Sequence, residues 1–65
     1  ETPKGVEVTQ RRKNGCTFTF ILNHNAEPEE IDLGGGTYHD LLTGRTLSGK
    51  VTIAGRDLLI LRRKD

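Results

Sequence analysis

The residues of this chain that could ligate a soft metal ion are Cys16, His24 and His39. A structural zinc site needs four ligands, and these usually come from closely spaced pairs of cysteine or histidine. The three residues are scattered along the chain and form no such pair. We therefore predict no metal site and no bound cofactor, and we expect His39 to be a hydrogen-bonded side chain of a strand.

The sequence also contains an acidic cluster, made up of Glu27, Glu29, Glu30 and Asp32. Two carboxylates about 5–5.5 Å apart can act as the catalytic pair of a retaining glycosidase. Such a pair also needs a cleft that excludes water, and a chain of 65 residues cannot enclose one. The cluster surrounds Pro28 at a predicted sheet edge, where charges discourage edge-to-edge pairing. We interpret it as a solvated edge and predict no catalytic residue in this chain.

Two basic clusters, residues 11–13 and 62–64, hold six of the ten lysines and arginines. Basic clusters can neutralise phosphates, but proteins that bind single strands also need exposed aromatic side chains. We expect Phe18 and Phe20 in the core, which leaves Tyr38 at most. The sequence therefore predicts no nucleic-acid partner, and the same shortage of aromatic residues argues against an autonomous sugar-binding module.

Residues 34–36 are three consecutive glycines, which raises the question of a phosphate-binding loop. Such a loop opens a helix whose N-terminus meets the anion, whereas these glycines precede a predicted strand. We interpret them as a flexible turn. No Ser/His/Asp or Cys/His arrangement has a spacing suited to nucleophilic catalysis.

Length and composition limit the fold and the class of protein. The chain has 65 residues and a net charge of +1, so it is too short for a (β/α)₈ barrel of about 250 residues or a doubly wound domain. A single cysteine excludes an intrachain disulfide and favours a cytoplasmic location. No apolar run approaches 18 residues, so we expect no membrane partner. The sequence lacks a signal peptide and begins with Glu1, and we interpret residues 1–65 as one domain of a longer protein.

The spacing of the glycines and the period-2 alternation between them predict strands and no helix. The expected strands cover residues 6–12, 16–23, 29–33, 37–42, 50–54 and 57–63. No connection is long enough for a parallel crossover. The predicted fold is therefore all-β, a small antiparallel β-sandwich that is Greek-key-like and has about six strands.

The first hairpin allows two registers. Asn14-Gly15 is the strongest short hairpin signal and usually forms a two-residue type I′ turn. A three-residue loop over residues 13–15 would instead place Val8 opposite Phe20, with Gly15 in the left-handed position of a bulge. We favour the second register because it gathers the apolar residues on one face, with Val6 opposite Leu22 and Gln10 opposite Phe18.

The predicted core combines apolar residues from all strands. Its members are Val6, Val8, Phe18, Phe20, Leu22, Ile31, Leu33, Tyr38, Leu41, Val51, Ile53 and part of the run Leu58, Leu59, Ile60 and Leu61. In that run both faces of the last strand are apolar, and so small a domain has no second core. We expect one of the pairs Leu58/Ile60 or Leu59/Leu61 to be partly exposed and to form a docking surface for a neighbouring domain.

The order of four segments resembles a known family. They are GVEVTQRR (residues 5–12), FTFILNHNAEPEEIDL (18–33), GTYHDLLTGRTLSGKVTI (36–53) and LLILRR (58–63). Together they resemble the C-terminal domain of glycoside hydrolase family 42 β-galactosidases. Residues 22–24 and 40–44 carry most of the likeness, and residues 54–57 depart from the family, which more often has proline or an aromatic residue there.

The resemblance implies a parent enzyme that hydrolyses terminal non-reducing β-D-galactosides with retention. Its catalytic glutamates would lie in an N-terminal barrel domain, the expected partner of this one, and the parent would be a trimer. Asp40, Thr43 and Gly44 then form a structural turn, in which Asp40 accepts backbone N–H groups and Gly44 takes a positive φ. The alternatives are the C-terminal domain of an amylase-like glycosidase, or a small carbohydrate- or nucleic-acid-binding β module.

Overall fold

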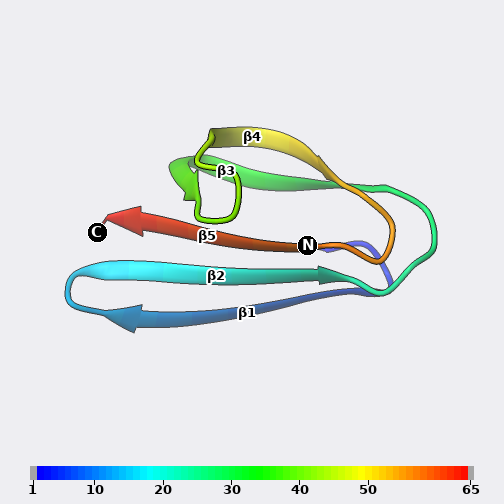
Figure 1. The fold of residues 1–65 in the computed structure, drawn as a ribbon, viewed down its shortest axis with the longest axis horizontal. Helices are drawn as coiled ribbons and strands as arrows, with labels where there is room; N and C mark the ends of the chain where they lie inside the picture. Colours follow the sequence, from blue (N-terminus) through cyan, green and yellow to red (C-terminus); the bar gives the residue numbers. More distant parts are fainter. Residues whose placement is uncertain (1, 65) are drawn as a thin grey trace.

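The computed structural model describes residues 2–64, which form five strands and no helix (Figure 1). The strands are β1 (Val6–Lys13), β2 (Cys16–Asn23), β3 (Glu29–Asp40), β4 (Thr46–Ile53) and β5 (Leu58–Lys64). They pair antiparallel in the order β1-β2-β5-β3-β4, so that β5 returns to lie between β2 and β3. The predicted all-β, antiparallel, sandwich-like fold is confirmed, with five strands in place of about six.

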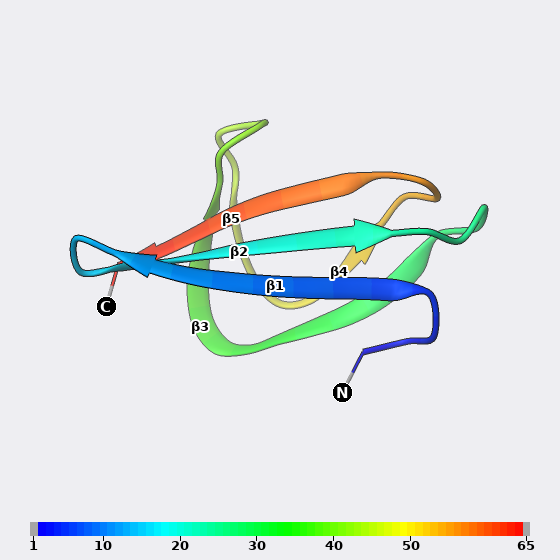
Figure 2. The ribbon, with the colours of Figure 1, turned by 90° about the horizontal axis from the view of Figure 1, so that it is seen from below.

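One strand replaces two predicted ones because the three glycines lie inside β3 and bend it. Gly34 has a φ of 79°, and its N–H donates to the carboxylate of Asp32 at 2.9 Å. The pairing with β4 shifts register between Asp32 and Thr37. Figure 2 shows the resulting bend, which brings the end of β3 to β5 and leaves its first half apart from the layer of β1, β2 and β5. The predicted flexible turn at residues 34–36 is therefore a bend within a strand.

The core lies between this three-stranded layer and the hairpin of β3 and β4. Its buried apolar members are Val6, Ile21, Ile31, Tyr38, Ile53 and Leu61, with Leu33, Leu47, Val51 and Leu59 packed against them. Two predicted core residues are wrong, because Val8 is 41% exposed and Leu41 is 44% exposed. Phe18, Phe20 and Leu22 are half-buried, so the prediction of a phenylalanine core is also wrong.

The predicted three-residue hairpin loop is wrong, and the two-residue turn is present. Lys13 pairs with Cys16, while Asn14 and Gly15 take φ values of 55° and 76°, as both central residues of a type I′ turn must. Val8 lies opposite Ile21. The three-residue loop was favoured on the assumption that Phe18 and Phe20 face the core of this domain, and that assumption is wrong.

Candidate functional site

Apolar side chains gather on the outer face of β2 and β5, the face turned away from the core. We call the set the apolar outer face, and its members are Phe18, Phe20, Leu22, Leu58 and Ile60. Cross-strand partners in a ladder share a face, and here Phe20 pairs with Ile60 while Leu22 pairs with Leu58. Leu58 is 37% exposed, and the other four side chains are half-buried. The face is thus an apolar surface that this domain leaves partly open to solvent.

The inner face of β2 is more polar, although Ile21 on this face is 2% exposed and belongs to the core. Thr17, Thr19 and Asn23 point toward the core and are 6%, 4% and 0% exposed. The hydroxyl of Thr19 accepts a hydrogen bond from Nε2 of Gln10 at 3.1 Å. Side chains alternate strictly along a strand, so threonines inside require phenylalanines outside. The two phenylalanines of β2 and Leu22 therefore lie on the outer face.

The predicted docking residues divide between the two faces of β5. Leu61 is fully buried at 0% exposure and Leu59 packs against the core, whereas Leu58 and Ile60 belong to the apolar outer face. The exposed pair is therefore Leu58/Ile60. Whether this pair docks onto another domain stays a prediction.

Basic side chains lie at one end of the apolar outer face. The ladders set Arg11, Phe18 and Arg62 in one row across β1, β2 and β5, and set Lys13, Cys16 and Lys64 in the next. We call Arg11, Lys13, Arg62 and Lys64 the basic end. A hollow of about 400 Å³ opens there, lined by Cys16, Thr37, Tyr38, His39, Arg62 and Lys64. The fold thus brings together the two basic clusters, which lie at opposite ends of the sequence.

Asp40, Thr43 and Gly44 form a closed turn between β3 and β4. Oδ1 of Asp40 accepts the N–H groups of Leu42 at 2.9 Å and of Thr43 at 3.3 Å. The N–H of Gly44, at a φ of 79°, donates to the carbonyl of Asp40 at 2.7 Å. These contacts are those of the structural turn expected from the sequence.

Electrostatics favour the charged form of Asp40 even though its side chain is only 1% exposed. Burial by itself raises the pKa of this carboxyl. The hydrogen bonds from Leu42 and Thr43 and the charge of Arg45 outweigh burial and hold the pKa below its ordinary value of 3.8. Asp40 is therefore a poor proton donor at neutral pH, as suits a structural turn.

Asn23 is a structural residue whose role the sequence analysis missed. It is 0% exposed, and its Nδ2 donates to the carbonyls of Glu27 at 2.9 Å and Ala54 at 3.1 Å. Its Oδ1 accepts the N–H of Asn25 at 2.9 Å. The side chain thereby joins the loop after β2 to the loop before β5. The signal was a lone amide at the end of an apolar strand, but its partners lie too far along the chain to be inferred.

The remaining candidates form no reactive arrangement. His24 lies on the surface with its Nε2 3.0 Å from the carboxylate of Glu7. Among residues 2–64, no three His, Cys, Asp or Glu side chains are grouped closely enough to hold a metal ion. That same stretch contains no helix able to cross a membrane. The most distinctive surface among the described residues is the apolar outer face with its basic end.

Comparison with known proteins identifies relatives over nearly the whole chain. Residues 5–63 match the sequence profile described as the β-galactosidase C-terminal domain. A β-galactosidase of Planococcus sp. is 44% identical over 61 residues, which cover 94% of this chain and 9% of that protein.

Two solved structures share the fold. A crystal structure of β-galactosidase from Bacillus circulans sp. alkalophilus has a TM-score of 0.93 and 51% identity, covering 97% of this chain and 9% of that one. A GH42 β-galactosidase from G. stearothermophilus has a TM-score of 0.88 and 25% identity, covering 100% of this chain and 9% of that one. The chain therefore spans about a tenth of the length of the relatives that it matches.

Proposed function

The chain belongs to the family of C-terminal domains of glycoside hydrolase family 42 β-galactosidases, and from this membership we propose that it is a non-catalytic accessory domain. Its parent is a β-galactosidase acting on terminal non-reducing β-D-galactosides, with the reaction carried out by residues outside this chain. A trimeric parent, a cytoplasmic location and the lack of nucleic-acid and membrane partners belong to the same proposal.

We further propose that the domain docks onto the catalytic part of its own enzyme through the apolar outer face. The observation that carries this proposal is the orientation of side chains on β2, where Thr17 and Thr19 point inward and the two phenylalanines point outward. Fully burying a leucine or phenylalanine contributes about 1.5–3 kcal/mol relative to exposing it. A tethered partner that covers this face would recover that stabilisation at high effective concentration.

The docking test uses the full-length enzyme carrying Leu58→Thr and Ile60→Thr together, since threonine keeps the strand preference and removes apolar surface. The matched control is Ser48→Thr with Lys50→Thr on the exposed face of β4. We expect the first variant to release the domain as a fragment under limited proteolysis about tenfold faster or more. Equal release from both variants would refute docking through this face.

The non-catalytic role has its own test. Incubation of this 65-residue chain with a chromogenic β-galactoside should give only the rate of the buffer. Turnover that a substitution in residues 27–32 abolishes would show that the carboxylates of this domain take part in the reaction.

A further inference from the structure

We propose that the surface that covers the apolar outer face is itself acidic on one side, and that it places a carboxylate in the hollow between Arg62 and Lys64. The occupant is a segment of the parent enzyme's own polypeptide that presents apolar side chains next to Asp or Glu. This inference rests on the docking role proposed above and specifies the chemistry of the partner.

The first support is the way β5 distributes its three consecutive cations. Arg63 is turned to the opposite side, where its guanidinium lies 5.4 Å from the centre of the Tyr38 ring and donates to the Tyr38 hydroxyl at 3.4 Å. Arg62 and Lys64 alternate with it and therefore share the side of Phe18 and Cys16. One cation of the cluster thus stabilises this domain, and two are directed to the proposed interface.

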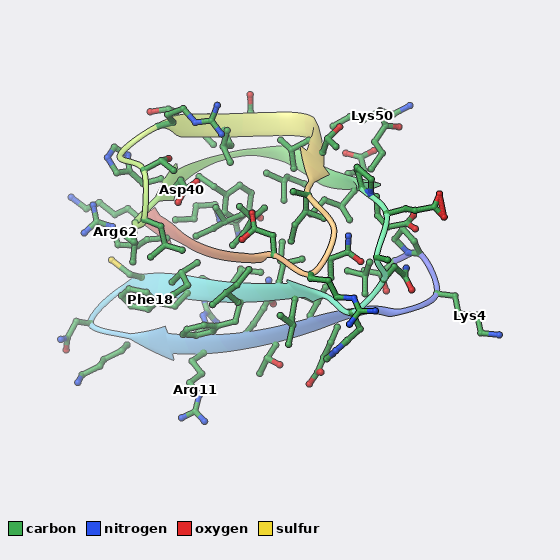
Figure 3. The ribbon with its side chains drawn as sticks, turned by 45° about the vertical axis from the view of Figure 1, so that its right-hand side comes forward. Lys4, Arg11, Phe18, Asp40, Lys50 and Arg62 are labelled. Carbon is green, nitrogen blue, oxygen red and sulfur yellow. The ribbon has the colours of Figure 1, made fainter. Side chains whose placement is uncertain are left out.

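The second support is that these outward cations lack acidic partners. Within residues 2–64, neither Arg62 nor Lys64 forms an ion pair, and the same holds for Arg11 and Lys13. Figure 3 shows Arg11 and Arg62 extending from β1 and β5 into the surroundings. Like charges gathered on one surface repel one another, and a carboxylate between them lowers that energy.

The third support concerns where the carboxylates of this domain lie. Among the described residues of β1, β2 and β5, the acid on the outer side is Glu7, at the far end of the face and 3.0 Å from His24. A second copy packed against this one through the same outer face would therefore bring only a carboxylate that already has a partner. The rest of the enzyme, about nine-tenths of the length of the relatives, supplies far more surface and remains tethered.

The residues that line the hollow are suited to binding a carboxylate. Arg62 and Lys64 line it together with His39 and Thr37. An arginine fork and a lysine ammonium bind a carboxylate with charge-assisted hydrogen bonds. Phe18 lies next to Arg62 in the ladder, so a segment with an apolar side chain beside Asp or Glu can contact the phenylalanine and the cations together.

The test compares two charge-reversed forms of the full-length enzyme. Arg62→Glu with Lys64→Glu alters the proposed interface. Lys4→Glu with Arg56→Glu makes the same change in net charge at the opposite end, where Figure 3 shows Lys4 and where Arg56 lies just before the start of β5. We expect the first variant to release the domain under limited proteolysis roughly tenfold faster at low salt, and the control to match the unmodified enzyme. Raising NaCl to about 1 M should bring the unmodified enzyme close to the first variant.

The outcomes separate this inference from the docking role. If both charge-reversed enzymes behave alike while Leu58→Thr with Ile60→Thr still releases the domain, docking stands and the acidic partner is refuted. If the leucine and isoleucine changes also have no effect, the docking role itself fails. A third outcome would also refute the acidic segment. If a single-stranded oligonucleotide of about 20 thymidines binds the enzyme, and Arg62→Glu with Lys64→Glu abolishes that binding, the partner of the basic end is nucleic acid.

Discussion

The two layers of this domain present opposite outer faces to their surroundings. On β3 and β4 the outward residues include Glu30, Asp32, Ser48 and Lys50, all exposed and polar. On β2 and β5 the corresponding positions hold the apolar outer face. Both layers bury an apolar inner face, so the fold does not require the second apolar surface. One layer thus presents a polar surface to water, whereas the other presents the surface to which the docking role is assigned by the proposal.

The comparison also explains why the buried side of β2 can be polar. Thr17 and Thr19 are enclosed by a core built mainly from other strands, where Ile53 and Leu61 are 1% and 0% exposed. The core therefore does not depend on the phenylalanines. Under the proposed docking role, these phenylalanines stabilise the domain only when the rest of the enzyme covers them.

The largest expected effect separates the inner and outer sides of one strand. In the isolated domain, Leu61→Ala should lower the free energy of unfolding by about 2–5 kcal/mol because it leaves a cavity in the core. Leu58→Ala should lower it by less than about 1 kcal/mol, since that side chain is 37% exposed and lies outside the core. Urea unfolding of the two variants measures the difference.

Equal decreases in the free energy of unfolding for Leu61→Ala and Leu58→Ala would contradict the distinction between the inner and outer sides of β5. That result would mean that the apolar outer face is part of the domain's own core. In the full-length enzyme the two variants should differ less in the stability that they lose, because Leu58 is then proposed to be covered.

The fold class was predictable from local patterns, whereas the assignment of faces was not. Glycine spacing and alternation predict antiparallel strands, and Asp40 with Gly44 predicts a turn from residues four positions apart. The register of the first hairpin was wrong because hydrophobicity was taken to mark the inside of this domain. With a neighbour expected on the outside, the same alternation is compatible with the type I′ turn that Asn14 and Gly15 form.

The buried side chain of Asn23, which joins two loops, shows a second limit of sequence reasoning. Its side chain contacts backbone groups up to 31 positions away, including the carbonyl of Ala54. Gly55, in the segment that departs from the family pattern, lies so close to the backbone of Ala26 that an added methyl group would overlap it. Such contacts depend on tertiary structure, so neither residue could be assigned a role in advance.

A smaller effect tests the junction between the two layers, where Asp40 pairs with Leu61. The folded state lowers the pKa of Asp40 below 3.8, so its carboxylate stabilises the fold fully above that pH. This stabilisation is lost as the pH falls through the lowered pKa. Asp40→Asn should be less stable than the unmodified domain at neutral pH, and the difference should shrink in acid.

Urea unfolding between about pH 5 and pH 2 measures this dependence. A difference between Asp40→Asn and the unmodified domain that stays constant over this range would show that Asp40 acts through shape alone. The junction between the two layers would then be stabilised without a contribution from the charge of Asp40.

The smallest effect concerns the turn that decides which side of β2 faces outward. Gly15 has a φ of 76° and an added methyl group would meet nothing within 4 Å, so Gly15→Ala introduces backbone strain alone. We expect it to lower the free energy of unfolding by about 1 kcal/mol. Gly35→Ala is the matched control, because its methyl group also meets nothing and its φ lies outside the left-handed region. If both substitutions are neutral, the turn does not enforce the register, and the outward position of Phe18 and Phe20 must be set by the pairing of β2 with β5.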